Sequence, residues 1–193
     1  MADMPVPDDD LDPDQDPTAD VQSGLFGKMT ATGDFVGRGL PDGFRRAWDH
    51  WLTQFVAPRL QQDMAGPAGG LRFRLVSGGR VAAGVILPSQ DSVGRRFPLS
   101  LLLLAADLPG PAGLDIWCDA AVALDHGQLP DDLWADLDAL PVPQGDGGRD
   151  ALLLWAQAVP VQSADPVSPE AALDALWSAG LATAAECQTP DDA

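Results

Sequence analysis

Apolar residues in the middle of the chain follow the spacing of three successive β-strands. Residues 71–76, LRFRLV, alternate apolar and basic side chains, which is the pattern of a half-exposed strand. An SGGR turn leads to residues 81–87, a nearly continuous apolar run, so these two strands are expected to form a β-hairpin. Residues 97–106, FPLSLLLLAA, indicate a strand buried on both faces. A polar loop, residues 88–96, separates the second strand from the third.

Helical periodicity appears on both sides of these strands. In residues 41–56 large apolar side chains recur every three to four positions, which predicts an amphipathic helix that Pro41 begins and Pro58 ends or kinks. Further helices are predicted over residues 113–127, 130–140 and 168–180, the last with Gly180 as its stop.

The remaining segments complete the predicted fold. Residues 25–29 and 151–159 indicate two more strands, and Gly33, Gly37 and Gly39 indicate a loop after the first of them. Strands and helices intermixed in this way predict an α/β domain. We expect a mixed, partly antiparallel sheet flanked by helices on both sides, in three layers.

A single domain is expected over residues 24–180, with a tail at each end. Residues 1–23 are rich in Asp and Pro with few large apolar groups, so burial cannot offset the entropy lost on ordering them. We therefore expect a disordered acidic tail there, and a loose C-terminal tail over residues 181–193. The alternative for the first tail is an acidic arm that covers a basic face of the domain.

Charge is distributed unevenly along the 193 residues, whose formal net charge is −18. Residues 1–23 carry −8, residues 24–100 carry +5, and residues 101–193 carry −15. An acidic protein of this kind disfavours nucleic-acid binding, because phosphate affinity grows with neutralising positive charge. The basic middle region instead suits an acidic partner surface or an acidic segment of the same chain.

Location and redox context follow from what the sequence lacks. No apolar stretch reaches the roughly 18–20 residues needed to span a bilayer, and the N-terminus does not resemble a secretory signal. We therefore expect a cytoplasmic protein without membrane insertion. Cys118 and Cys187 are far apart and outside any CxxC spacing, so we interpret them as isolated thiols rather than a disulfide or zinc site.

Sequence motifs of catalysis are also missing. There is no G-x-S-x-G elbow, P-loop, G-x-G-x-x-G or H-E-x-x-H motif, and each histidine merely follows an aspartate along the chain. We expect no catalytic set, no metal and no cofactor.

Two polar loops hold the residues that could form a site. The candidates for partner binding or loop bracing are Asp34, Arg38, Asp49, Ser89, Asp91, Arg95 and Arg96. Carboxylates and guanidiniums in such loops can pair with one another and hold the loops together. They can also form an exposed surface that docks a partner.

Three blocks of sequence resemble one known family. The blocks are GLFGKMTATGDFVGRGLP, FRRAWDHWL and GVILPSQDSVGRRFPLSL. They match the G-x-x-G-K and G-D-F-V segments, the W-D-x-W-L helix and the P-S-x-D-x-V-G-R-x-F-P-L block of the type VI secretion system-associated protein TagF, also called ImpM. The resemblance covers residues 24–106 firmly and 107–180 loosely. Arg95 falls on a position of the pattern, whereas Arg96 falls on a position that the pattern leaves open.

The resemblance implies an α/β fold and a cytoplasmic, non-catalytic regulator. Members of the family are thought to repress type VI secretion post-translationally by binding the forkhead-associated (FHA) scaffold protein of the system. The motif block implies that Arg95 braces the loop, against Asp91 or Asp34, and that Arg96 faces solvent or a partner.

Two other classes of function stay open at the level of sequence. The first is a small-molecule hydrolase or ligand-binding enzyme in which Asp34, Asp91 and Arg95 converge on a phosphorylated or carboxylated substrate. The second is a structural component of the secretion machine. The residues leave the oligomeric state undetermined.

Overall fold

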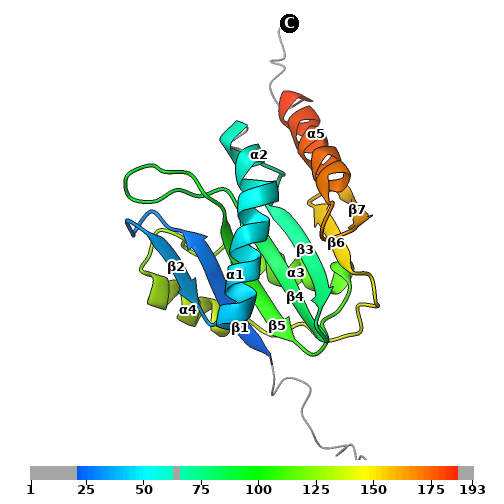
Figure 1. Cartoon of the computed structure of the whole chain (residues 1–193), viewed down its shortest axis with the longest axis horizontal. Coiled ribbons are helices and arrows are strands. Elements are labelled where there is room, and N and C mark those ends of the chain that lie inside the picture. Colours follow the sequence, from blue (N-terminus) through cyan, green and yellow to red (C-terminus); the bar gives the residue numbers. More distant parts are fainter. Residues whose placement is uncertain (1–20, 63–65, 187–193) are drawn as a thin grey trace, which may run out of the picture.

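A single β-sheet organises the part of the chain described by the computed structural model, residues 21–62 and 66–186 (Figure 1). Within these residues seven strands lie in the order β2-β1-β5-β4-β3-β6-β7, and each neighbouring pair is antiparallel. The strands are β1 Gln22–Lys28, β2 Phe35–Arg38, β3 Leu71–Ser77, β4 Arg80–Leu87, β5 Leu99–Ala105, β6 Leu152–Ala156 and β7 Val159–Ala164.

Helices cover both faces of the sheet, which confirms the predicted three-layer α/β architecture (Figure 1). The sheet is antiparallel throughout the described residues, whereas a mixed sheet was expected. One face carries the continuous helical segment α1–η1–α2 together with α5, and the other carries α3 and α4. The helices are α1 Asp42–Trp51, the π-helix η1 Leu52–Val56, α2 Ala57–Gln62, α3 Pro111–Val122, α4 Pro130–Asp138 and α5 Glu170–Glu186. None of the helices in the described residues is long and apolar enough to cross a membrane.

Strand β5 separates two hydrophobic cores. Its leucines alternate between the faces, so that Leu102 and Leu104 pack under α1 while Leu101 and Leu103 pack under α3 and α4. All seven residues of β5 are buried, as the continuous apolar run predicts.

The glycine-containing segment before the first helix is a strand rather than the predicted loop. Phe35–Arg38 form β2, which pairs with β1 through a register that sets Phe26 opposite Gly37. The glycine lowers the intrinsic strand preference of this segment, and hydrogen bonds to β1 stabilise its extended conformation instead. As an edge strand, β2 needs hydrogen-bond partners along one side only. Strand β1 itself begins at Gln22, earlier than expected and inside the range assigned to the acidic tail. The rest of that predicted tail, residues 1–20, lies outside the described residues.

Pro58 does not end the first helix. The chain passes from α1 through the π-helix η1 into α2, which continues to Gln62. In the π-turn the Ala57 N–H donates to the carbonyl of Leu52, five residues back. This wider turn accommodates a proline, whose ring would clash with the carbonyl four residues back in a regular α-helix.

The C-terminal region differs from the prediction in two places. Residues 151–159 were expected to form one strand, but they begin a hairpin in which β7 returns along β6 after a turn with Ala158 at φ +61°. Pro160 in β7 is compatible with this edge position, because along one edge of the strand no neighbouring strand of the described sheet would receive an N–H. Helix α5 runs through Gly180 to Glu186, because one glycine costs a long helix only about 1 kcal/mol. Residues 187–193 lie outside the described residues.

Strand β3 is not half-exposed, since its two arginines are buried under α3 and the segment before it. Arg72 is 3% exposed and donates to the carboxylates of Asp115 and Asp119, at 2.5 Å each. Arg74 is fully buried and pairs with Asp107 at 3.0 Å. Alternating basic residues resemble a solvated face in a sequence, but here helix α3 supplies the counter-charges of Arg72, and Asp107 in the segment before α3 supplies that of Arg74.

Cys118 lies beside this ion-pair cluster and is a free, buried thiol, as predicted. Burial raises the pKa of the Cys118 thiol to about 12, although the positive charge of Arg72 acts in the opposite direction. The thiol is therefore protonated and unreactive in the folded protein. Cys187 lies outside the described residues.

The buried Arg72 predicts that its two carboxylates are needed for stability. Replacing both Asp115 and Asp119 with Ala leaves a buried guanidinium without counter-charge and removes the acceptor of the Trp155 indole N–H. We expect a loss of about 3 kcal/mol in the free energy of unfolding, measured by urea titration. The control Asp42→Ala breaks the exposed Asp42–Arg45 pair and should cost less than about 1 kcal/mol. Equal losses in the two variants would contradict this account.

Candidate functional site

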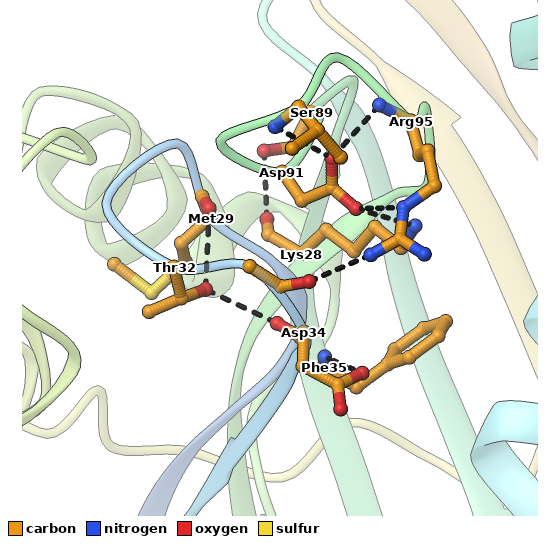
Figure 2. A network of polar contacts seen from close by, with 10 residues as sticks. Lys28, Met29, Thr32, Asp34, Phe35, Ser89, Asp91 and Arg95 are labelled. Atoms are coloured by element: carbon orange, nitrogen blue, oxygen red, sulfur yellow. Dashed lines mark hydrogen bonds and ion pairs between the residues drawn. The ribbon is translucent and has the colours of Figure 1, made fainter.

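The polar loop between β4 and β5 is anchored by a buried ion pair between Lys28 and Asp91 (Figure 2). Lys28 ends strand β1, and its Nζ lies 2.9 Å from Oδ2 of Asp91. Lys28 is 7% exposed and Asp91 is 1% exposed. A charge pair removed from water to this extent is stable only when its remaining hydrogen-bonding capacity is satisfied.

Asp91 meets that condition because it accepts four hydrogen bonds. Its Oδ1 accepts the backbone N–H groups of Val93 at 3.1 Å and Arg95 at 2.8 Å, and its Oδ2 accepts Lys28 and the Nε of Arg95, the latter at 2.6 Å. Gly94, with φ +82°, closes the turn that brings these donors around the carboxylate. Burial alone would raise the pKa of Asp91, but the hydrogen bonds from Lys28, Arg95 and Val93 hold that pKa well below its usual range.

Backbone contacts fix the loop to the end of β1. The Ser89 hydroxyl donates to the carbonyl of Lys28 at 2.7 Å. Gly27 has φ +143°, and a Cβ at this position would overlap the carbonyl of Pro98 at the other end of the loop. The close approach of these two backbones therefore needs a glycine directly before the buried lysine.

A second loop, residues 29–34, packs against the first. The Ser92 N–H donates to the carbonyl of Thr32 at 2.8 Å, and Nη2 of Arg95 donates to the carbonyl of Gly33 at 2.6 Å. Arg95 thus spans the two loops, holding Asp91 with one nitrogen and the neighbouring backbone with another (Figure 2). This arrangement fits the bracing role that the family pattern implies for Arg95, with Asp91 rather than Asp34 as its partner.

Asp34 does not join the ion-pair network. Its carboxylate is exposed and accepts the N–H of the next residue, Phe35, at 2.7 Å (Figure 2). The enzyme alternative requires Asp34, Asp91 and Arg95 to converge on one substrate. Instead the Asp91 carboxylate is enclosed by its hydrogen-bond donors, and the Asp34 carboxylate accepts a backbone N–H of its own loop.

The other candidates lie at separate places. Arg38 is at the far end of β2 and pairs with Asp131 of α4 at 2.5 Å. Asp49 is half-buried on α1. Arg96 is exposed, and its backbone forms an isolated bridge with Gln90. The structure therefore brings together Ser89, Asp91 and Arg95, and leaves the remaining four predicted residues outside this cluster.

Lys28 is the member of the cluster that sequence reasoning did not select. It is the sole lysine of the chain and follows directly on an apolar strand, which is a signal that could have identified it. Its Nζ also lies 5.2 Å from the centre of the Phe35 ring, so an aromatic side chain shields the buried charge.

The tryptophan block of the sequence meets the same strand end. The indole N–H of Trp48 donates to the hydroxyl of Ser100 at 3.0 Å, and both residues are buried. Ser100 lies on β5, two residues after Pro98 at the end of the loop. Across residues 21–62 and 66–186, no three His, Cys, Asp or Glu side chains are grouped so as to hold a metal ion.

The enclosure of Asp91 predicts a large stability loss when its charge is removed. Asp91→Asn retains the shape but leaves the Lys28 ammonium buried without its counter-charge. We expect the melting temperature to fall by about 10 °C at pH 7. Asp34→Asn, the matched control in the neighbouring loop, should change it by no more than about 2 °C. Comparable falls in both variants would remove the special role of Asp91.

The lowered pKa of Asp91 also predicts a pH dependence. A carboxyl whose folded pKa is below its unfolded pKa, about 3.9, contributes stability that is complete well above that pH and is lost as the pH falls. The gap in melting temperature between the native protein and Asp91→Asn should therefore be largest near neutral pH and narrow below about pH 4. Thermal melts from pH 7 to pH 2.5 measure the gap, and a constant gap would refute the linkage.

Comparison with known proteins places this geometry in context. A family model described as "TagF N-terminal domain, Type VI secretion system-associated" matches residues 24–123, which include most of β1, the anchored loop and α3. The crystal structure of PA0076 from Pseudomonas aeruginosa PAO1 is similar at 32% sequence identity and a TM-score of 0.51. The similarity covers 72% of this chain and 72% of that one. Among curated proteins, no sequence matches this chain.

The loop junction lies within the range that the family model matches. Gly27, Lys28, Ser89, Asp91 and Arg95 all fall inside the matched range and hold one loop junction together. The resemblance inferred from the three sequence blocks is thereby confirmed: the chain belongs to the family of type VI secretion system-associated proteins that carry the TagF N-terminal domain.

Proposed function

We propose that this protein is a non-catalytic, cytoplasmic regulator of a bacterial type VI secretion system. In this proposal it represses secretion post-translationally by binding the FHA-domain scaffold protein of the system. Family membership supports an association with the secretion system, and the scaffold partner and the repressor role are our extension of it.

The observation that carries the proposal is how the anchored loop uses its polar groups. Asp91 and Ser89 are engaged with the protein itself, as is one edge of the Arg95 guanidinium. Other side chains of the loop face solvent, among them Val93, which is 71% exposed, and Arg96. A loop held rigid from inside loses little entropy when a partner binds, which favours a docking surface.

An exposed aromatic residue extends this surface. Phe35 is 45% exposed and packs edge-on against Phe97 with the ring centres 4.7 Å apart. Arginine and aromatic residues are the types most often found at the energetic centre of protein–protein interfaces. Phe35, Val93, Arg95 and Arg96 together are the proposed docking surface.

The two adjacent arginines predict separate effects on folding and binding. Arg95→Ala should lower the melting temperature, because it removes the bridge between the loops, with a smaller effect on binding. Arg96→Ala should leave the melting temperature unchanged and weaken binding to the purified FHA-domain scaffold by about tenfold, or roughly 1.4 kcal/mol. Thermal melts and titrations on the same preparations measure both quantities.

Arg149→Ala supplies the matched control, since Arg149 is exposed and lies outside the docking surface. In cells, loss of the gene should raise effector secretion, and Arg96→Ala should raise it partly. Scaffold binding that is equally strong in Arg96→Ala and Arg149→Ala would reject this surface. Unchanged secretion in the deletion strain would reject the repressor role.

A further inference from the structure

A groove on the α1 face of the sheet has an apolar floor and one basic residue, Arg80, in its lining. Its volume is about 460 Å³, and it lies between the first turns of α1 and the adjacent ends of β3, β4 and β5. Leu75, Ala82 and Leu104 line its floor, and Phe44 and Ala47 of α1 line its wall. No side chain from the described residues fills this space, so the groove is an apolar surface that another segment can cover.

Strand register connects the groove directly to the start of the described chain. Gln22 is paired with Leu104, Leu104 with Ala82, and Ala82 with Leu75, so one row crosses four strands. Paired residues project to the same face of a sheet, so Gln22 belongs to the face that carries the groove. With about 4.8 Å between strands, Leu75 lies about 14 Å from Gln22, a distance that five extended residues cover.

Figure 1 shows the same relation at the level of elements: β1 begins at the end of the sheet where α1 also begins and where β3 turns into β4. Residues 1–20 therefore join the domain beside the groove. They are long enough to reach every part of it.

Charge complementarity favours this segment as the occupant. Residues 1–20 contain eight Asp and no Lys or Arg. Arg80 lines the groove, and the exposed Arg46 lies on the helical turn that follows Gly43, another lining residue. The backbone N–H groups of the first turn of α1, which has no side-chain cap, add positive potential at the same end.

We propose that residues 1–20 occupy this groove, with Leu11 against the apolar floor and the flanking aspartates directed toward Arg46, Arg80 and the start of α1. The segment would then be an internal competitor for any acidic partner that uses this face. A second copy of the chain is a poorer occupant, because each copy carries a net charge of −18. The inference does not depend on the proposed role in secretion, and its test uses no secretion component.

The test uses the full-length chain and a labelled synthetic peptide with the sequence of residues 1–20. In one variant all eight Asp of residues 1–20 are replaced by Asn, which preserves the chain length and weakens its own segment as a competitor. The peptide should bind this variant at least tenfold more tightly than it binds the native chain, as measured by fluorescence anisotropy. Binding should weaken strongly in 1 M NaCl, because the attraction is electrostatic.

Groove substitutions in the same Asn-substituted chain locate the binding site. Ala47→Glu places an acid on the groove wall and should weaken peptide binding at least tenfold. Ala112→Glu is the matched control, an exposed alanine of α3 on the opposite face of the sheet, and should leave binding unchanged. Arg46→Glu reverses the charge of an exposed residue beside the groove, and it decides the question if Ala47→Glu does not fold.

Three results would overturn the proposal. The first is equal peptide affinity for the native and Asn-substituted chains. The second is that the peptide binds the Arg46→Glu chain, or a folded Ala47→Glu chain, as tightly as it binds the Ala112→Glu chain. The third is that the peptide does not bind the Asn-substituted chain at concentrations up to about 1 mM. A tethered segment has an effective concentration of that order, so a segment with such weak affinity would leave the groove mostly empty. Dimerisation of the Asn-substituted chain, seen by size-exclusion chromatography, would assign the groove to a second copy instead.

Discussion

The buried ion pair between Lys28 and Asp91 is the interaction on which the loop junction depends. Removing two charges from water costs several kcal/mol, and their mutual attraction offsets that cost only with near-complete hydrogen bonding. Asp91 reaches this state through donors from β1, from the loop backbone and from Arg95. A loop conformation that lacked these donors would leave the buried charge of Asp91 without hydrogen bonds. The main effect of the ion pair is therefore to select one conformation of the loop, rather than to add net stability.

Family membership and physical chemistry explain the same residues in different ways. The sequence blocks that characterise the family are separated along the chain, yet they meet where β1 ends and β5 begins. Gly27 permits the close approach of Pro98, Lys28 neutralises Asp91, and Trp48 binds Ser100. These positions build a scaffold of fixed shape. The surface that such a scaffold presents is formed by the residues between them, of which Arg96 is the clearest example.

Much of the fold could be predicted from local patterns, and the failures have specific physical causes. Strands β3, β4 and β5 and helices α3 and α4 follow from their periodicity, because burial on one or two faces leaves a direct pattern in the sequence. Strand β2 was missed because Gly37 has no strand preference of its own, and the hydrogen bonds that stabilise the strand come from β1, outside its own four residues. The burial of Arg72 depends on acids more than forty residues away, which no window of sequence contains. For the same reason the sequence indicated a bracing role for Arg95 but not that Lys28 completes the cluster.

The burial of Lys28 has a consequence for the chemistry of the whole chain. Lys28 carries the sole side-chain amine of the protein, and it is 7% exposed and held in an ion pair. Reagents and enzymes that modify lysine therefore meet no accessible lysine side chain while the loop is closed. Acylation of Lys28 requires the loop to open. The rate of that acylation therefore reports how readily the junction between β1 and the loop opens.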